Sequence, residues 1–237
     1  MALAALGGAT ACSQSEKVGP HERSLPVPVT FAVAPILNFS GYFDLDPVKA
    51  ADLLASELSY VPGAQVLPVN RVVAMLASQG GQQITSPAHA LEVAEAVGAD
   101  AIVVAGVTEY DPYTPVIGLA VQIYARSPLA WESWDAVGAS REAQPALTAE
   151  APGATNVPVG QYQAVYNGSH AKVADLVRAY AKTREASEDY VFGWQQYLKV
   201  QTLFLRFCWQ DAIGQLMSQE HCVRAMVACV GPGEDPA

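Results

Sequence analysis

The segment Ala94–Tyr110, AEAVGADAIVVAGVTEY, joins the end of a helix to the most hydrophobic strand of the chain. Ser86 and Pro87 precede it with residue types that favour the start of a helix, and Gly98 favours its end. Residues 99–108 then have the continuous apolar character of a strand that is buried on both faces. The segment therefore predicts a helix packed on a sheet.

The residues before this segment show the same alternation of strand and helix. Residues 29–36 and 64–68 predict strands, and Asp46 followed by Pro47 predicts the start of a helix between them. A second helix, which we expect Asn70 to cap, runs toward the glycines that precede the Ser86 helix.

After residue 108 the chain predicts a hairpin, because a Pro-rich turn leads into a half-exposed strand at residues 116–126. The resulting order is β-α-β-α-α-β-β, an α/β fold with a single mixed sheet and helices packed on it. Asp100, at the start of the buried strand, is expected to hydrogen-bond the loop that it leaves.

The C-terminal part differs in composition. Residues 161–166 predict a short edge strand, and amphipathic helices are expected at 170–184, 194–217 and 220–230. We therefore divide the chain into a signal remnant and tether (1–28), an α/β domain (29–126), a surface loop or linker (127–160), a helical C-terminal extension (161–230) and a disordered tail (231–237).

Three motifs in the α/β domain resemble those of the TolB N-terminal-like domain, which is shared with CsgG and LpoB. They are VAPILN at 33–38, VLPVNR at 66–71 and the block at 94–110. The resemblance implies a protein-binding, non-catalytic accessory role in the bacterial envelope. The C-terminal part is similar to the tail of uncharacterised envelope lipoproteins of planctomycete type.

The N-terminus resembles a bacterial lipobox, in which small residues precede a lipid-modified cysteine. Here Ala9–Ala11 precede Cys12, and residues 13–28 have the polar composition of a tether. The resemblance implies a cleaved signal, a diacylglyceryl (palmitate-type) anchor on Cys12 and an outer-membrane lipoprotein facing the periplasm. No Lys or Arg precedes Cys12, so this interpretation expects a charged region upstream of Met1. The alternative is an Ala-rich N-terminus that happens to contain a cysteine.

Composition restricts the classes of partner. Apolar residues make up 51% of the chain and charged residues 15%, which favours a packed globular domain. A formal net charge of −10 argues against binding to nucleic acid or to anionic lipid. We therefore expect membrane contact through the N-terminal lipid only, and envelope proteins of unknown identity as partners.

The remaining cysteines are Cys208, Cys222 and Cys229. Cys222 and Cys229 lie too far apart to pair if one helix carries both, so a disulfide would join Cys208 to one of them. Buried unpaired thiols are the alternative. The set lacks a C-x-x-C element, so no metal site is expected.

The sequence predicts no enzyme and no cofactor. It has no phosphate-binding P-loop, no dinucleotide fingerprint and no nucleophile elbow, and Ser40 is its nearest approach to a serine in a tight turn. An enzyme would instead need groups such as Asp111 and His170 to converge on an activated Ser or Cys.

The candidate partner-binding residues are aromatic. Tyr110, Asp111 and Tyr113 occupy the hairpin turn, and Trp131 and Trp134 follow in the loop. Tyrosine is a favoured interface anchor, although these rings could equally pack onto their own domain. The preferred hypothesis is a lipid-anchored scaffold or accessory factor, which an exposed aromatic patch would favour. The alternative is a small-ligand or glycan-binding module, which a cleft lined by Tyr113 and the two tryptophans would favour.

Overall fold

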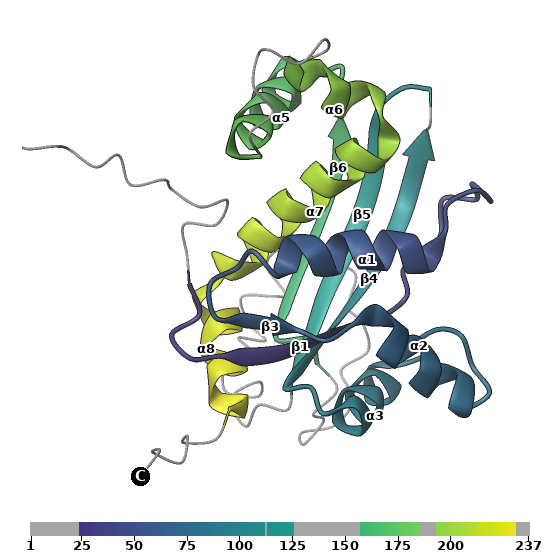
Figure 1. Cartoon of the computed structure of the whole chain (residues 1–237), viewed down its shortest axis with the longest axis vertical. Helices are drawn as coiled ribbons and strands as arrows, with labels where there is room; N and C mark the ends of the chain where they lie inside the picture. Colours follow the sequence, from purple (N-terminus) through teal and green to yellow (C-terminus); the bar gives the residue numbers. More distant parts are fainter. Residues whose placement is uncertain (1–23, 112, 126–156, 185–192, 231–237) are drawn as a thin grey trace, which may run out of the picture.

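The computed structural model describes residues 24–111, 113–125, 157–184 and 193–230 (Figure 1). Strands and helices alternate through the first half of the chain, and helices follow the last strand. In chain order the elements are β1 (Val29–Val33), β2 (Leu37–Asn38), α1 (Pro47–Leu58), β3 (Ala64–Val66), α2 (Val69–Ser78), α3 (Pro87–Val97), β4 (Ala101–Asp111), β5 (Val116–Ala125), β6 (Gly160–Asn167), α5 (Ala171–Thr183), the 3₁₀ helix η2 (Gly193–Gln195), α6 (Gln196–Lys199), α7 (Gln201–Met217) and α8 (Glu220–Cys229).

A single mixed sheet organises the fold. Its strand order is β3-β1-β4-β5-β6, and the short β2 also pairs with β4. Strand β1 pairs in parallel with β3 and with β4, and β2 pairs in parallel with β4, whereas β4–β5 and β5–β6 are antiparallel. This arrangement confirms the predicted α/β class, and β6 confirms the predicted edge strand.

Helices cover both faces of the sheet. In Figure 1, α1 and α7 lie across its front face, where alternate residues of β4 such as Val103 and Val107 enter the larger core. The other set, including Ile102, packs with Leu76 and Val93 of α2 and α3. A strand buried on both faces explains why residues 99–108 are almost continuously hydrophobic.

The C-terminal helices share the core of the α/β part. Phe204, Phe207 and Trp209 of α7 are at most 1% exposed and belong to the same cluster as Phe31 of β1 and Leu54 of α1. The described C-terminal helices therefore share the larger core with β1, α1 and β4, while α2 and α3 pack in a second cluster on the opposite face of the sheet. Among the described helices, none is both long and apolar enough to cross a bilayer.

Two sequence expectations for the helix boundaries were wrong. Asn70 does not cap α2, because the helix begins at Val69 after Pro68, whose ring fixes φ and whose carbonyl accepts the Arg71 N–H at 3.0 Å. The stretch 194–217 is not one helix. Val200, a β-branched residue with an extended backbone, separates α6 from α7.

Asp100 also bonds differently from the expectation. Its carboxylate accepts the Thr30 N–H at 2.7 Å, and its own N–H donates to the Thr30 carbonyl at 2.8 Å. The partner is therefore the neighbouring strand β1 and not the loop before β4. This pair of hydrogen bonds fixes the register of the parallel strands β1 and β4.

We predict that Asp100→Ala lowers the free energy of unfolding by about 1–3 kcal/mol, because it leaves the Thr30 N–H without its acceptor. Asp100→Asn keeps a side-chain oxygen at that position and should lose less. Chemical denaturation of the two variants checks this, and equal losses would contradict the assignment.

Candidate functional site

Five aromatic residues come from the β4–β5 hairpin and from the loop between β2 and α1. We call this group the aromatic apex; it consists of Phe39, Tyr42, Phe43, Tyr110 and Tyr113. The Tyr42 and Tyr110 rings stack with centroids 5.2 Å apart and planes inclined by 30°. That stack joins the loop to the hairpin.

The loop half of the apex is held by its own polar groups. The Asn38 side chain accepts hydrogen bonds from the Ser40 N–H and hydroxyl, and it donates to the Tyr42 carbonyl at 2.8 Å. Gly41 has φ +74°, a conformation that a side chain would strain. The Ser40 hydroxyl therefore serves the turn, donating to Asn38 and accepting the Tyr42 N–H at 3.2 Å.

The hairpin half is shaped by Asp111. Its carboxylate accepts the N–H groups of Tyr113 at 2.8 Å and Thr114 at 3.1 Å. These backbone hydrogen bonds lower the pKa of Asp111 below its usual value. The Gln201 side chain of α7 donates to the Asp111 carbonyl. Asp111 thus organises the turn that presents Tyr113.

Exposure divides the apex into anchors and supports. Phe43 is 97% exposed, Tyr113 is 96% exposed and Phe39 is 66% exposed. Tyr110 is half-buried and packs inward, and burial raises its pKa. Tyrosine is one of the residue types enriched at the hot spots of protein interfaces. The other predicted contact residues, Trp131 and Trp134, and the predicted lipid-attachment residue Cys12 lie outside the described residues.

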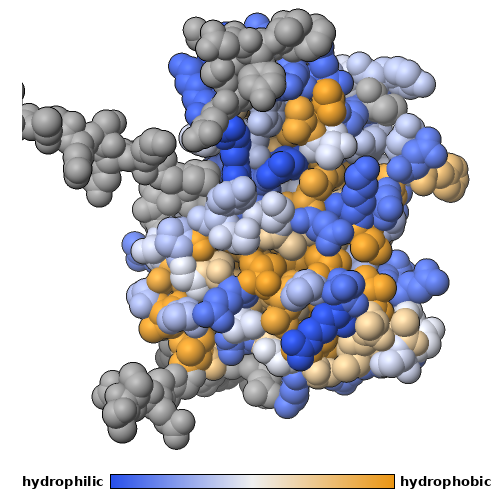
Figure 2. All heavy atoms as spheres, in the orientation of Figure 1, coloured by the Kyte–Doolittle hydropathy of each residue, from blue (hydrophilic) through white to orange (hydrophobic). Residues whose placement is uncertain are grey.

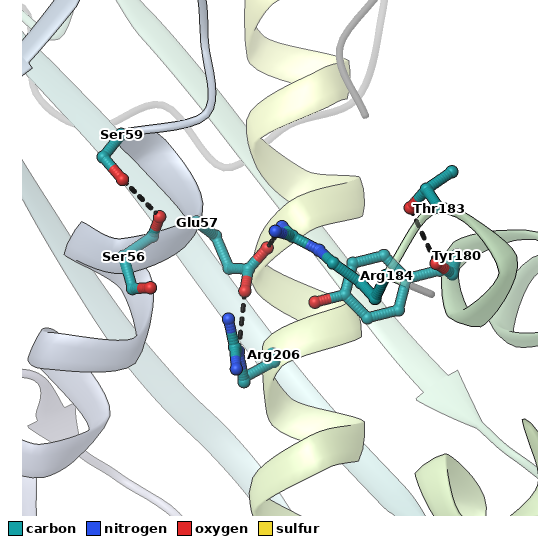
Figure 3. A network of polar contacts seen from close by, with 7 residues as sticks. All are labelled: Ser56, Glu57, Ser59, Tyr180, Thr183, Arg184 and Arg206. Carbon is teal, nitrogen blue, oxygen red and sulfur yellow. Dashed lines mark hydrogen bonds and ion pairs between the residues drawn. The ribbon is translucent and has the colours of Figure 1, made fainter. Parts of the chain in front are cut away.

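A buried ion-pair network lies between α1, α5 and α7 (Figure 3). Glu57 of α1 is fully buried and accepts hydrogen bonds from Arg184, at the end of α5, and from Arg206 of α7, the latter at 2.7 Å. The Arg184 guanidinium also lies 3.6 Å from the centroid of the Tyr60 ring. Burial and the Glu57 charge raise the pKa of Tyr180 beside it.

Sequence reasoning missed this network. Glu57 has the same helical spacing as Ala50, Leu53 and Leu54, so the sequence alone places it on the apolar side of the helix. An acidic residue on the buried side of a helix requires a cationic partner, so Glu57 itself indicated that such a partner exists. Its partners could not be identified because they lie 127 and 149 residues away along the chain.

We predict that Glu57→Ala lowers the free energy of unfolding by about 3–5 kcal/mol, because it leaves two guanidinium groups near the core without their counter-charge. The matched control is Asp175→Ala, which removes the partner of an exposed ion pair with Arg178. That variant should change stability by less than about 1 kcal/mol. Equal effects in chemical denaturation would show that the network contributes no more than a surface pair.

The three C-terminal cysteines are free thiols in the structure. Cys208 is fully buried, and burial raises its pKa; burial also raises the pKa of Cys222 to about 12. Cys222 and Cys229 lie on the one helix α8, as expected. Within the described residues, no three His, Cys, Asp or Glu side chains form a group that could hold a metal ion.

We predict that alkylation of the folded protein at pH 8.5 labels Cys229 at least tenfold faster than Cys222. The thiolate is the reactive species, so a pKa near 12 suppresses reaction at Cys222 until the chain unfolds. Peptide mass mapping with iodoacetamide in a Cys12→Ala background measures this. A disulfide would give a different result. Cys208 and either Cys222 or Cys229 would then resist alkylation even in denaturant, and both would become reactive once a reductant is added.

Within the described residues, Phe204 and Phe207 fill the space between the sheet and the C-terminal helices, and Tyr113 is 96% exposed. The cleft that the sequence predicts also includes Trp131 and Trp134, which the structure does not describe. A hollow does exist on the opposite face of the sheet, beside Phe39. It is lined mainly by apolar residues: Leu37, Phe39, Val104, Ala105, Gly106, Thr108, Ala120 and Gln122. Figure 2 shows hydrophilic and hydrophobic residues interspersed on the face that carries α1 and α7.

No family model and no curated protein matches the chain. Among solved structures it is similar to the lipoprotein GNA1162 from Neisseria meningitidis, at 16% identity over 68% of this chain and 99% of that one, with a TM-score of 0.42. It is also similar to the C-terminal domain of LpoB from Salmonella enterica, at 12% identity over 61% and 87%, with a TM-score of 0.40. The hypothetical protein CT253 from Chlamydia trachomatis has 13% identity over 87% and 100%, with a TM-score of 0.33. At these values the comparisons assign the chain to no family.

Proposed function

We propose that this chain is a lipid-anchored protein of the bacterial cell envelope that acts as a non-catalytic scaffold or accessory factor. It would be attached through Cys12 to the outer membrane, face the periplasm and contribute a docking surface to a larger assembly. The aromatic apex carries this proposal, because it exposes Phe43 and Tyr113 almost completely on turns that hydrogen bonds hold in place.

The exposed aromatic side chains of the apex can be buried by a partner at a low entropic cost. Burying a large aromatic side chain removes much apolar surface from water, and few rotatable bonds must be immobilised. The Asn38 and Asp111 hydrogen bonds fix the two turns before a partner arrives, which lowers that cost further. The chemistry around the apex also fits docking better than catalysis, since Ser40 and Asp111 are both committed to their own turns.

We predict that the double variant Phe43→Ala, Tyr113→Ala recovers at least tenfold less envelope protein than the unmodified chain when both are purified after cross-linking in the native host. Both side chains are exposed, so its melting temperature should stay close to that of the unmodified chain. Quantitative mass spectrometry of the cross-linked membrane fraction provides the measurement.

The matched control is Leu176→Ala, which removes an exposed apolar side chain on α5, away from the apex. It should leave co-purification unchanged. If the apex variant retains its full set of cross-linked proteins, or if the control loses the same set, the aromatic apex is not the docking surface.

A further inference from the structure

The two edges of the sheet differ in how they are protected from pairing. The β3 edge is three residues long, is preceded by Pro62 and followed by Pro68, and has Leu25 bonded to the Pro62 carbonyl at 2.8 Å. Short edge strands, prolines and a covering segment are devices that prevent pairing between chains. The β6 edge, by contrast, is eight residues long.

The hydrogen bonds show which groups of β6 face away from the sheet. The Gly168 N–H donates to the Pro115 carbonyl, so the even-numbered residues of β6 bond to β5. The odd-numbered residues must then direct their N–H and C=O groups to the free edge. The Gln161 carbonyl confirms this parity, because it accepts the Gln219 side chain at 2.9 Å on that edge.

Among the described residues, none hydrogen-bonds the backbone at the centre of this edge. At its ends, the Gln161 carbonyl is occupied by Gln219 and the Asn167 carbonyl accepts the His170 N–H at 3.0 Å. Between them, the backbone groups of Gln163 and Val165 have no hydrogen bond to another described residue. Their side chains are exposed, Val165 by 59%.

Nothing in the strand sequence protects this edge. GQYQAVYN contains no charged residue and no proline, and its register with β5 is continuous, whereas the β4–β5 pair is interrupted between Val107 and Glu109. A chain of net charge −10 repels its own copies over most of its surface. The β6 edge itself adds no charge to that repulsion.

We propose that β6 pairs antiparallel with β6 of a second copy of this chain, with the two-fold axis at Ala164. In this register Gln163 faces Val165 of the other copy on both sides of the axis. These are the two residues whose edge groups are free, so each N–H finds a carbonyl and the occupied ends remain undisturbed. The sheet then continues from one protomer into the next, independently of the aromatic apex.

Sedimentation velocity of the full chain over a range of concentrations tests the association. The unmodified chain should dimerise, and Gln163→Pro should weaken the dimer at least tenfold. Proline at 163 removes an N–H that points to the free edge and leaves the bonds to β5 intact. Val165→Lys should act equally by placing like charges near the axis, whereas Leu176→Lys on α5 should have no effect.

An engineered cysteine tests the register. Ala164→Cys, in a Cys12→Ala, Cys229→Ser background, places the two Cα atoms about 4.5 Å apart across the axis, within the range of a disulfide. Oxidation should give a covalent dimer, and Ala120→Cys on the inner strand β5 should not. A monomer at every concentration, or a dimer that Gln163→Pro and Val165→Lys both leave intact, would overturn the proposal. So would the failure of Ala164→Cys to cross-link within a dimer.

Discussion

The buried carboxylate of Glu57 is the constraint on which the arrangement of the C-terminal half depends. It lies on α1, and its two cationic partners come from the end of α5 and from α7. A buried carboxylate is tolerated only where charge and hydrogen bonds compensate it, so α5 and α7 have to meet α1 at this point. The core aromatics of α7 are thereby held against the sheet, and Gln201, at the start of the same helix, reaches the carbonyl of Asp111.

This connection links the interior to the surface of the molecule. The Asp111 carboxylate accepts the N–H groups of Tyr113 and Thr114 and so shapes the turn that exposes Tyr113. Tyr110 stacks on Tyr42 of the loop between β2 and α1. The hairpin part of the apex therefore contacts α7 through Gln201 and the loop after β2 through Tyr42. If the apex docks a partner as proposed, these hydrogen bonds order its two turns before binding, which lowers the entropic cost of association.

The central sheet and its flanking helices were predictable from sequence because their signals are local. Continuous apolar residues at 99–108 marked the buried strand, and Asp46–Pro47 and Ser86–Pro87 marked two helix starts that the structure retains. The errors arose where local signals compete. Asn70 is a good cap by residue type, but Pro68 and the buried Val69 begin that helix earlier.

The candidate site was only half predictable for a related reason. The tyrosines of the hairpin were evident in the sequence, but which ring is exposed depends on contacts with Tyr42, far away along the chain. Phe39 and Phe43 carried no pattern that distinguishes an exposed aromatic from a core residue. The Glu57 network and the free edge of β6 depend on partners and topology that only the folded chain defines.

The most direct test of the central claim, that the aromatic apex contacts another envelope protein, is photo-cross-linking in living cells. A photoreactive phenylalanine analogue is placed at Tyr113, at Phe43 or, for comparison, at Leu176, all of which are exposed. The account predicts the same discrete cross-linked product from both apex positions and none from Leu176. Absence of a product at the apex, or identical products from all three positions, would contradict it.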